Sequence, residues 1–358
     1  MSSTVIALDA FGGDHCPNAE VDGAVEAART GVSVVLVGDR DPIVAALGKH
    51  ADHARLPITI HHAPGRITME DHPGKAVRAK PDASMPTCFD LVRCGEAGAV
   101  MSAGNSGAML ACGLFKYRRL RGVDRPAFVT SMPNRDGFTV VLDIGANVEC
   151  KPVNFVQFAV MGAAYARFKN GRARPRVGVL SNGSEDGKGT DLTRTVHELL
   201  SSAQSPDFVY AGYAEGAGFF DGQFDVIVTD GFTGNVALKV AEATGRLIGH
   251  WLRQAVTADL RSKLGALLLR PAFASLRDTM NPDTYGAAPL LGVDGPAWIC
   301  HGGASPFAIA NALRLAARSV DEGLVGAIGE SLTRNAAFVA AAKGHGAAPK
   351  PRVENAGS

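Results

Sequence analysis

One pattern recurs five times along the chain and constrains its fold more than any other feature. A short apolar stretch is followed by a loop of glycine, asparagine and aspartate and then by a helical segment; the apolar stretches end near residues 8, 101, 142, 180 and 228. This alternation predicts an α/β protein with helices on both faces of its sheet. Because ligands of such sheets bind beyond the carboxyl ends of strands, we expect the five loops to line one crevice at one rim.

Local signals place several helix starts. Pro17 predicts a helix over residues 18–28, and Thr190 is a suitable N-cap for a helix over 192–200. Further helices are expected from residues 108, 152 and 236. Loops that feed helix starts present free N–H groups with partial positive charge, which favours a phosphate. Any single loop of this kind is equally explained as a turn that caps a helix. The evidence for a phosphate site is therefore the repetition of the pattern.

Composition excludes several classes of protein. The 36 Lys and Arg residues nearly balance the 35 Asp and Glu residues, so no overall field attracts nucleic acid. The six cysteines form no C-x-x-C pair, which predicts neither disulfides nor a zinc site, and we expect no metal or cofactor. The first residues lack a secretion signal, and no apolar run approaches the ~20 residues of a membrane span. We therefore expect a cytoplasmic protein with a large core, 46% of its residues being hydrophobic.

Familiar catalytic motifs are absent from the loops. A nucleotide-binding P-loop would need Gly where Asn182 stands and Ser or Thr where Gly189 stands, and no G-x-G-x-x-G follows a strand. Ser106 lies in a sequence one residue short of a nucleophile elbow, so it is expected to start a helix rather than to attack a substrate. His15 and His301 each lie among glycines near a strand end, and either could transfer a proton. Lys188, between two glycines, is the best candidate for an anion contact.

Four of these loops together resemble the phosphate acyltransferase (PlsX) family of bacterial phospholipid synthesis. They span residues 6–14, 102–107, 142–147 and 229–235, and residues 124–126 and 285–292 extend the resemblance over roughly residues 4 to 335. The resemblance implies a three-layer α/β/α fold with a large mixed sheet in two intertwined halves, like isocitrate and isopropylmalate dehydrogenases. It also implies conversion of acyl-(acyl carrier protein) and inorganic phosphate into acyl phosphate and free carrier protein.

The residue types fit this chemistry. Phosphate with a second pKa near ~6 is already a nucleophile, so it needs positioning more than a base. We assign Lys188 and the neighbouring N–H groups to phosphate, and Asn105 and Asn235 to the thioester oxygen. His15 completes the predicted catalytic set. The predicted binding set, in which the aspartates orient their neighbours, is Asp9, Gly12, Gly13, Asp14, Gly104, Ser106, Asp143, Asn147, Asn182, Gly187, Gly189, Asp230, Gly234 and His301.

Two other functions stay open from the residues. A CoA-dependent phosphotransacetylase shares the phosphate chemistry, and a non-catalytic scaffold for lipid-synthesis enzymes would use the same surfaces. As domains, we expect one catalytic unit over residues 1–342, containing an amphipathic helical segment over 245–285, and a disordered tail over 343–358.

Charged and apolar clusters suggest partners. The acidic carrier protein is expected at Arg118, Arg119 and Arg121, or else at the basic cluster over residues 172–176. Residues 260–280 place Leu268 and Phe273 on an apolar helical face among basic residues, which suits peripheral contact with the inner face of a membrane or an ordinary dimer. The resemblance further implies a homodimer and a downstream glycerol-phosphate acyltransferase.

Overall fold

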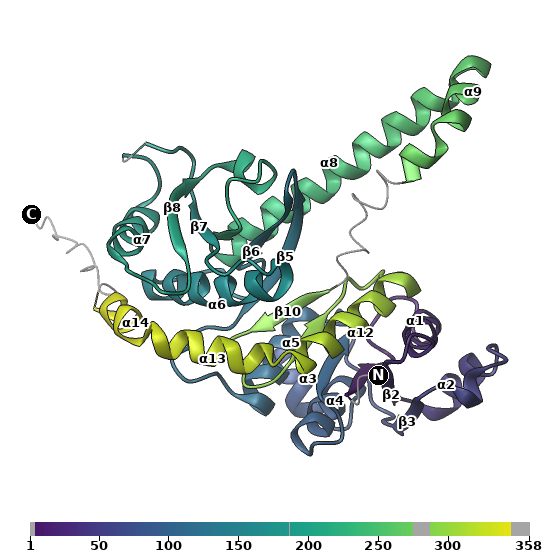
Figure 1. Ribbon diagram of the computed structural model, residues 1–358. Helices are drawn as coiled ribbons and strands as arrows, with labels where there is room; N and C mark the ends of the chain where they lie inside the picture. The colour runs from purple at the N-terminus through teal and green to yellow at the C-terminus, as the bar shows by residue number, and fades with distance from the viewer. Residues whose placement is uncertain (1–3, 186, 275–286, 345–358) are drawn as a thin grey trace, which may run out of the picture.

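Figure 1 shows the structure, a computed structural model that describes residues 4–185, 187–274 and 287–344. At its centre is an 11-stranded sheet with the order β3-β2-β1-β4-β11-β10-β5-β6-β9-β7-β8. The strands are β1 (Val5–Asp9), β2 (Ser33–Gly38), β3 (Ile58–His62), β4 (Ala99–Ser102), β5 (Ala127–Asn134), β6 (Gly137–Leu142), β7 (Arg176–Leu180), β8 (Val209–Ala214), β9 (Val226–Val228), β10 (Ala288–Leu291) and β11 (Ala297–Ile299).

Helices cover both faces of this sheet. They are α1 (Asn18–Ala28), α2 (Arg40–Leu47), α3 (Pro73–Ala79), α4 (Ser84–Arg93), α5 (Ser106–Cys112), α6 (Pro152–Asn170), α7 (Asp191–Ser202), α8 (Gly231–Thr257), α9 (Leu260–Leu268), α12 (Pro306–Asp321), α13 (Leu324–Arg334) and α14 (Ala336–Lys343). Shorter helical turns are η1 (His53–Arg55), η2 (Gly113–Tyr117) and η3 (Gly216–Phe219).

Most helix starts agree with the local signals. Helix α1 has the predicted bounds, and Thr190 caps α7 by accepting a hydrogen bond from the Thr193 N–H. Two predicted starts are wrong, because α5 and α8 begin at residues 106 and 231 rather than 108 and 236. In both cases the side chain of the residue before the helix, Asn105 or Asp230, accepts an N–H from the first turn and fixes an earlier start.

The sheet is mixed, so the expectation that all five loops lie at one rim is wrong. β1 and β4 are parallel to each other, but three successive antiparallel pairings, β11 with β10, β10 with β5 and β5 with β6, reverse the direction of the strands beyond. β6, β9 and β7 therefore run against β1 and β4. Sequence reasoning missed this reversal because none of the five recurring segments contains β5 or β10.

The register nevertheless brings the carboxyl ends of both groups to the same level. The end of β11, Ile299, pairs with Ala288 at the start of β10, while the end of β6, Leu142, pairs with Val129 near the start of β5. β10 in turn pairs its last residues with the first residues of β5. The two halves of the sheet are thus staggered, and the loops that leave them face each other across β10 and β5.

The two faces of the sheet are covered differently. One face has a continuous core in which α1 and α12 cover the first half and α6, α7 and α13 cover the second. On the other face the core has two parts, one beneath α4 and α5 and one beneath η3 and the start of α8. The interruption lies where the staggered halves meet. A space on this face can therefore take residues from both halves.

The chain passes between the halves three times. β1 to β4 belong to the first half and β5 to β9 to the second, and β10 and β11 then return to the middle of the sheet. α12 packs on α1, whereas α13 and α14 pack on α6 of the second half. The expected mixed sheet in intertwined halves is confirmed.

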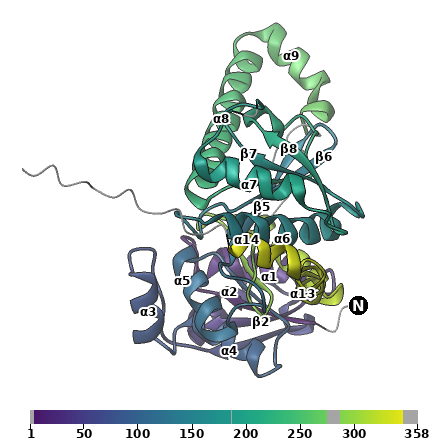
Figure 2. The same cartoon turned by 90° about the vertical axis from the view of Figure 1, so that its left-hand side faces the viewer.

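Helices α8 and α9 extend away from this body, as both views show (Figure 1, Figure 2). Among the described residues, no helix is both long and apolar enough to traverse a bilayer. The predicted tail begins at Lys343, which is the last residue of α14, and residues 345–358 lie outside the described residues. The division into a unit over 1–342 and a tail stays a prediction.

Candidate functional site

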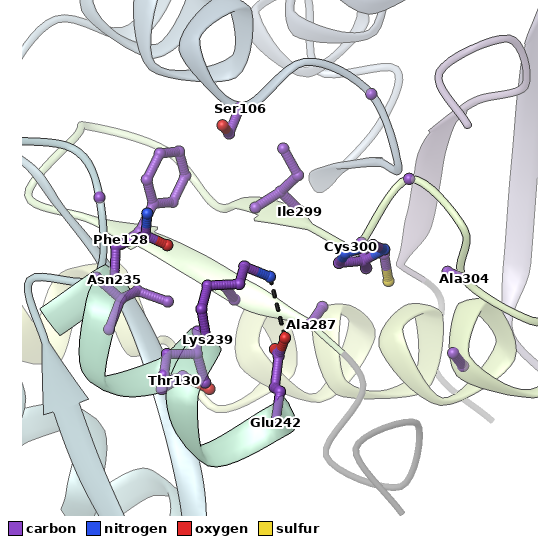
Figure 3. Close-up of a pocket in the computed structure, with 18 of the residues that line it drawn as sticks. Ser106, Phe128, Thr130, Asn235, Lys239, Glu242, Ala287, Ile299, Cys300 and Ala304 are labelled. Atoms are coloured by element: carbon purple, nitrogen blue, oxygen red, sulfur yellow. Dashed lines mark hydrogen bonds and ion pairs between the residues drawn. The ribbon is translucent and has the colours of Figure 1, made fainter. Parts of the chain in front are cut away.

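A cavity of about 400 Å³ lies where the two halves of the sheet meet. Its lining comes from the loops after β4, β6 and β11, from β5 and β10, from α8 beyond its first turn, and from the first turn of α12. Figure 3 shows Ser106 and Ile299 on one side of this space and Asn235 and Lys239 on the other. The ammonium group of Lys239 in this lining favours an anionic ligand.

A buried carboxylate shapes the first rim of the cavity. Asp9 accepts hydrogen bonds from the Phe11 N–H at 3.2 Å and the Ser102 hydroxyl at 2.7 Å. Ser102 Oγ in turn accepts the Gly104 N–H at 2.9 Å, which fixes Gly104 at the cavity wall. Burial raises the pKa of Asp9. A Cβ on Gly12 would lie 2.6 Å from Ser102 Oγ, so only glycine permits this approach.

The loop after β1 also contacts the loop after β11. The Asp14 N–H donates to the Gly302 carbonyl at 2.8 Å, and the Gly13 N–H donates to Glu20 Oε1 at 3.0 Å. Glu20 is buried, which raises its pKa to about 7, and its Oε2 is buried with no hydrogen-bond partner. Sequence reasoning missed Glu20, because a glutamate inside a helix gives no sign of burial.

The two candidate histidines occupy different positions. His15 is exposed and does not belong to the cavity lining, whereas His301 lines the cavity. His301 Nδ1 accepts the Gly303 N–H at 3.2 Å, so a neutral ring carries its proton on Nε2. Among the two, the structure brings only His301 to the cavity.

Asn105 has structural partners at both ends of its amide. Its Oδ1 accepts the Ala108 N–H at 3.0 Å, and its Nδ2 lies 3.3 to 3.4 Å from the carbonyls of Thr68, Met69 and Asp71. The amide therefore holds the segment before α3 against the start of α5. Its neighbour Ser106 lines the cavity, as does Gly104.

Asp143 organises the second rim. Its carboxylate is fully buried, which raises its pKa, and it accepts five hydrogen bonds. The donors are the N–H groups of Phe128, Gly145, Ala146 and Asn147 and the Asn147 side-chain amide. This loop also sets the start of α8, since the Gly231 N–H donates to the Asn147 carbonyl at 2.7 Å. A Cβ on Gly234 would overlap the Asp143 carbonyl, so α8 begins pressed against the loop.

Helix α8 carries polar side chains to the cavity. Asp230 caps the helix by accepting from Thr233 at 2.8 Å, and Asn235, one turn along, lines the cavity. Lys239 and Glu242 also line it and pair with each other at 3.0 Å (Figure 3). Both were missed, although spacings of four and seven residues from Asn235 place them on the same helix face. In the parts of the chain that are described, no cluster of His, Cys, Asp and Glu could hold a metal ion.

The loop after β7 lies outside this constellation. Lys188 and Gly187 are exposed, and neither they nor Asn182 and Gly189 line the cavity. Asn182 holds the loop by accepting the Gly189 N–H at 2.8 Å. The structure therefore brings together the loops after β4, β6 and β11 and the start of α8, with the loop after β1 behind them, but it does not bring Lys188 to the same wall.

The predicted docking residues are exposed. Arg118, Arg119 and Arg121 lie on the surface after η2, and Arg119 donates to the Asp124 carbonyl at 2.7 Å. The alternative basic cluster is largely neutralised, since Arg172 and Arg176 both pair with Asp225. Leu268 is 84% exposed on α9, Phe273 is half-buried, and residues 275–280 of the predicted apolar face lie outside the described residues.

Comparison with known sequences gives the family. Residues 4–326 match the family described as fatty acid synthesis protein. A phosphate acyltransferase of Geobacter sulfurreducens is 48% identical over 320 residues, which cover 89% of this chain and 91% of the relative. A phosphate acyltransferase of Citrifermentans bemidjiense is 46% identical over 347 residues, 97% of each chain.

Solved structures share the fold at low identity. A phosphotransacetylase from Streptococcus pyogenes aligns with a TM-score of 0.59 and 15% identity, over 90% of this chain and 95% of that one. The EutD phosphotransacetylase from Staphylococcus aureus aligns with a TM-score of 0.54 and 15% identity, over 88% and 94%. These likenesses confirm the fold class expected from the sequence.

Proposed function

The chain belongs to the phosphate acyltransferase family, and on this premise we propose that it transfers an acyl group from acyl carrier protein to inorganic phosphate. The products are acyl phosphate and the free thiol of the carrier, and the acyl phosphate feeds phospholipid synthesis. No cofactor takes part. The residues of the cavity support each part of this reaction.

The proposal is carried by one observation: the side chains of Lys239, Asn235 and His301 line the same cavity. The full positive charge of Lys239 attracts the phosphate dianion. Lys239 takes the place that sequence reasoning gave to Lys188, since Lys188 is exposed outside the lining. Glu242 pairs with Lys239, and an entering dianion competes for the same ammonium group.

Phosphate itself is the nucleophile. One of its oxygens attacks the thioester carbonyl carbon, and the tetrahedral intermediate then collapses with cleavage of the carbon–sulfur bond. The Asn235 side chain, which has no hydrogen-bond partner in the described structure, and His301 Nε2 supply donors to the transient oxyanion. A thiol with a pKa near ~8.5 leaves as thiolate and takes a proton from solvent or from His301.

The buried aspartates act through the backbone. Asp9 fixes Gly104, and Asp143 fixes the loop after β6, so both hold cavity walls in place without facing phosphate. Asn105 has a similar positioning role toward α5. These contacts place the carboxylates behind the N–H groups, where their charge does not repel the ligand directly.

A thiol-release assay tests the function. Palmitoyl carrier protein incubated with the purified protein is expected to release thiol only when inorganic phosphate is present, and Asn235→Ala is expected to lower kcat about 100-fold. The neighbouring substitution Val236→Ala, on an exposed side chain outside the cavity lining, is the matched control. Absence of phosphate-dependent release from any acyl thioester would leave a scaffold as the remaining function.

The same assay distinguishes between the two candidate acyl donors. Acyl-CoA is the donor in the alternative function, a CoA-dependent phosphotransacetylase. We expect a kcat/KM at least tenfold higher for the carrier protein, because a protein donor adds a contact surface at Arg118, Arg119 and Arg121. A preference for acyl-CoA would overturn this part of the proposal.

The exposed apolar side chains of α8 and α9 support the proposed location. We place the protein in the cytoplasm as a homodimer that touches the inner face of the membrane, near the glycerol-phosphate acyltransferase that uses its product, and without nucleic acid partners. Trp251 on α8 and Leu268 on α9 are 58% and 84% exposed. Liposome flotation of the wild type against a Leu268→Glu, Phe273→Glu variant tests the membrane contact. If the variant floated as well as the wild type, these two side chains would not contact the membrane, and α8 and α9 would serve dimerisation alone.

A further inference from the structure

A second hollow, the side groove, lies next to the cavity. Its volume is about 730 Å³, and the lining residues that matter here are Leu110, Leu114, Phe115, Arg119, Arg125 and Lys151. Of the site residues predicted from the five loops, Asn147 alone lines this groove. The groove thus needs an explanation of its own.

The side groove and the cavity share two walls. In the loop after β6, Ile144 and Gly145 line the cavity, whereas Ala146 and Asn147 line the groove. On α5, Ser106 lines the cavity and Leu110 the groove, and four residues of helix separate them by about 6 Å along the axis. A ligand whose reactive end lies at Ser106 can therefore extend along α5 into the groove.

One part of the groove is apolar. Leu114 and Phe115 follow Leu110 along α5 and η2, and both are exposed, Phe115 by 47%. The guanidinium group of Arg78 lies 4.8 Å from the centre of the Phe115 ring. Large apolar side chains left exposed in a concave surface indicate a ligand that covers them.

Another part of the groove is cationic. Arg125 and Lys151 are exposed, and in the described structure neither pairs with a carboxylate. Two acids also belong to the lining, Asp124 and Glu149, but Asp124 is paired with Lys343 at 3.0 Å. With Arg119 included, the groove carries an excess of positive charge that suits one anionic group of the ligand.

We propose that the side groove binds the 4′-phosphopantetheine arm of the carrier protein, an inference that rests on the proposed function. The arm joins a thiol, two amides and a branched hydrocarbon to a phosphodiester, so it needs an apolar wall and cations at its far end. A bare acyl chain would need only the apolar wall. The thioester end then reaches the cavity along α5, and the phosphodiester lies at Arg125 and Lys151.

Charge reversal in the groove tests this proposal. Arg125→Glu and Lys151→Glu are each expected to weaken binding of free pantetheine 4′-phosphate about tenfold, measured by calorimetry. Arg55→Glu makes the same change of charge on an exposed residue of η1, beside edge strand β3, and is expected to bind the arm like the wild type. Lys151 precedes α6, where a glutamate favours the helix dipole, so this variant is expected to fold.

Turnover provides the second measurement. The ratio of kcat/KM for palmitoyl phosphopantetheine to that for palmitoyl N-acetylcysteamine, which lacks the phosphate group, is expected to fall about tenfold in both groove variants. An unchanged ratio together with unchanged calorimetry would overturn the proposal. If the effect occurred with acyl-CoA but not with acyl carrier protein, the assignment to the carrier would be wrong. Failure of the proposed function shows separately, as a wild type that binds the arm yet releases no thiol with phosphate.

Discussion

The loops after β6 and β7 look alike in sequence but have opposite environments. Each combines glycine, asparagine and an acidic residue after a buried strand. In the loop after β6, Asp143 is fully buried and accepts five hydrogen bonds, and the loop lines the cavity. In the loop after β7, Asn182 makes one hydrogen bond at an exposed position, and Lys188 faces solvent. The comparison teaches that a loop becomes part of a site through the strand it follows, not through its composition.

The largest expected difference concerns stability. Asp143→Ala leaves several buried N–H groups without an acceptor and is expected to lower the free energy of unfolding by about 3 kcal/mol or more. Asn182→Ala removes one exposed hydrogen bond and should cost less than about 1 kcal/mol. Urea denaturation of both variants measures the difference. Equal losses would break the comparison between the two loops.

A pH profile extends the comparison to the loop after β1. Burial raises the pKa of Glu20 to about 7 from an ordinary value of 4.5. Between these two values the folded state binds more protons than the unfolded state, so the free energy of unfolding falls as pH rises. Above pH 7 the loss attributable to Glu20 reaches about 3 kcal/mol.

Glu20→Gln is expected to remove this part of the pH dependence between about pH 4.5 and 7, leaving the parts due to Asp9 and Asp143. Thermal or urea unfolding across that range measures it. A variant that keeps the full slope of the wild type would show that Glu20 is not the group responsible.

The smallest expected difference separates the two lysines. Lys239→Ala is expected to raise KM for phosphate about tenfold, because it removes the cation in the cavity lining. Lys188→Ala should change it less than about threefold, since the side chain is exposed elsewhere. Initial rates at varied phosphate concentration measure both. The reverse order would mean that the loop after β7 closes onto the cavity.

Glu242→Gln sharpens the same test. Removing the carboxylate frees Lys239 from its partner at 3.0 Å, so KM for phosphate is expected to fall. A rise would indicate that Glu242 is needed to hold the lysine in place.

The sequence by itself determined several elements of the fold, and the family. The bounds of α1, the Thr190 cap and the strands at residues 139–142, 176–180 and 226–228 follow from short-range pattern and cap chemistry, which act over a few residues. The recurring loops also indicated an anion site, and the residues in them carried the resemblance to phosphate acyltransferases.

Only the tertiary structure decided which loops meet. Three antiparallel pairings in the middle of the sheet reverse half of the strands, and the stagger of β10 and β5 then brings Gly104, Asn235 and His301 to one cavity. The same arrangement admits Lys239 and leaves Lys188 outside. Pairings between strands distant in the chain depend on how whole layers bury their apolar faces against each other, and no local pattern encodes that choice.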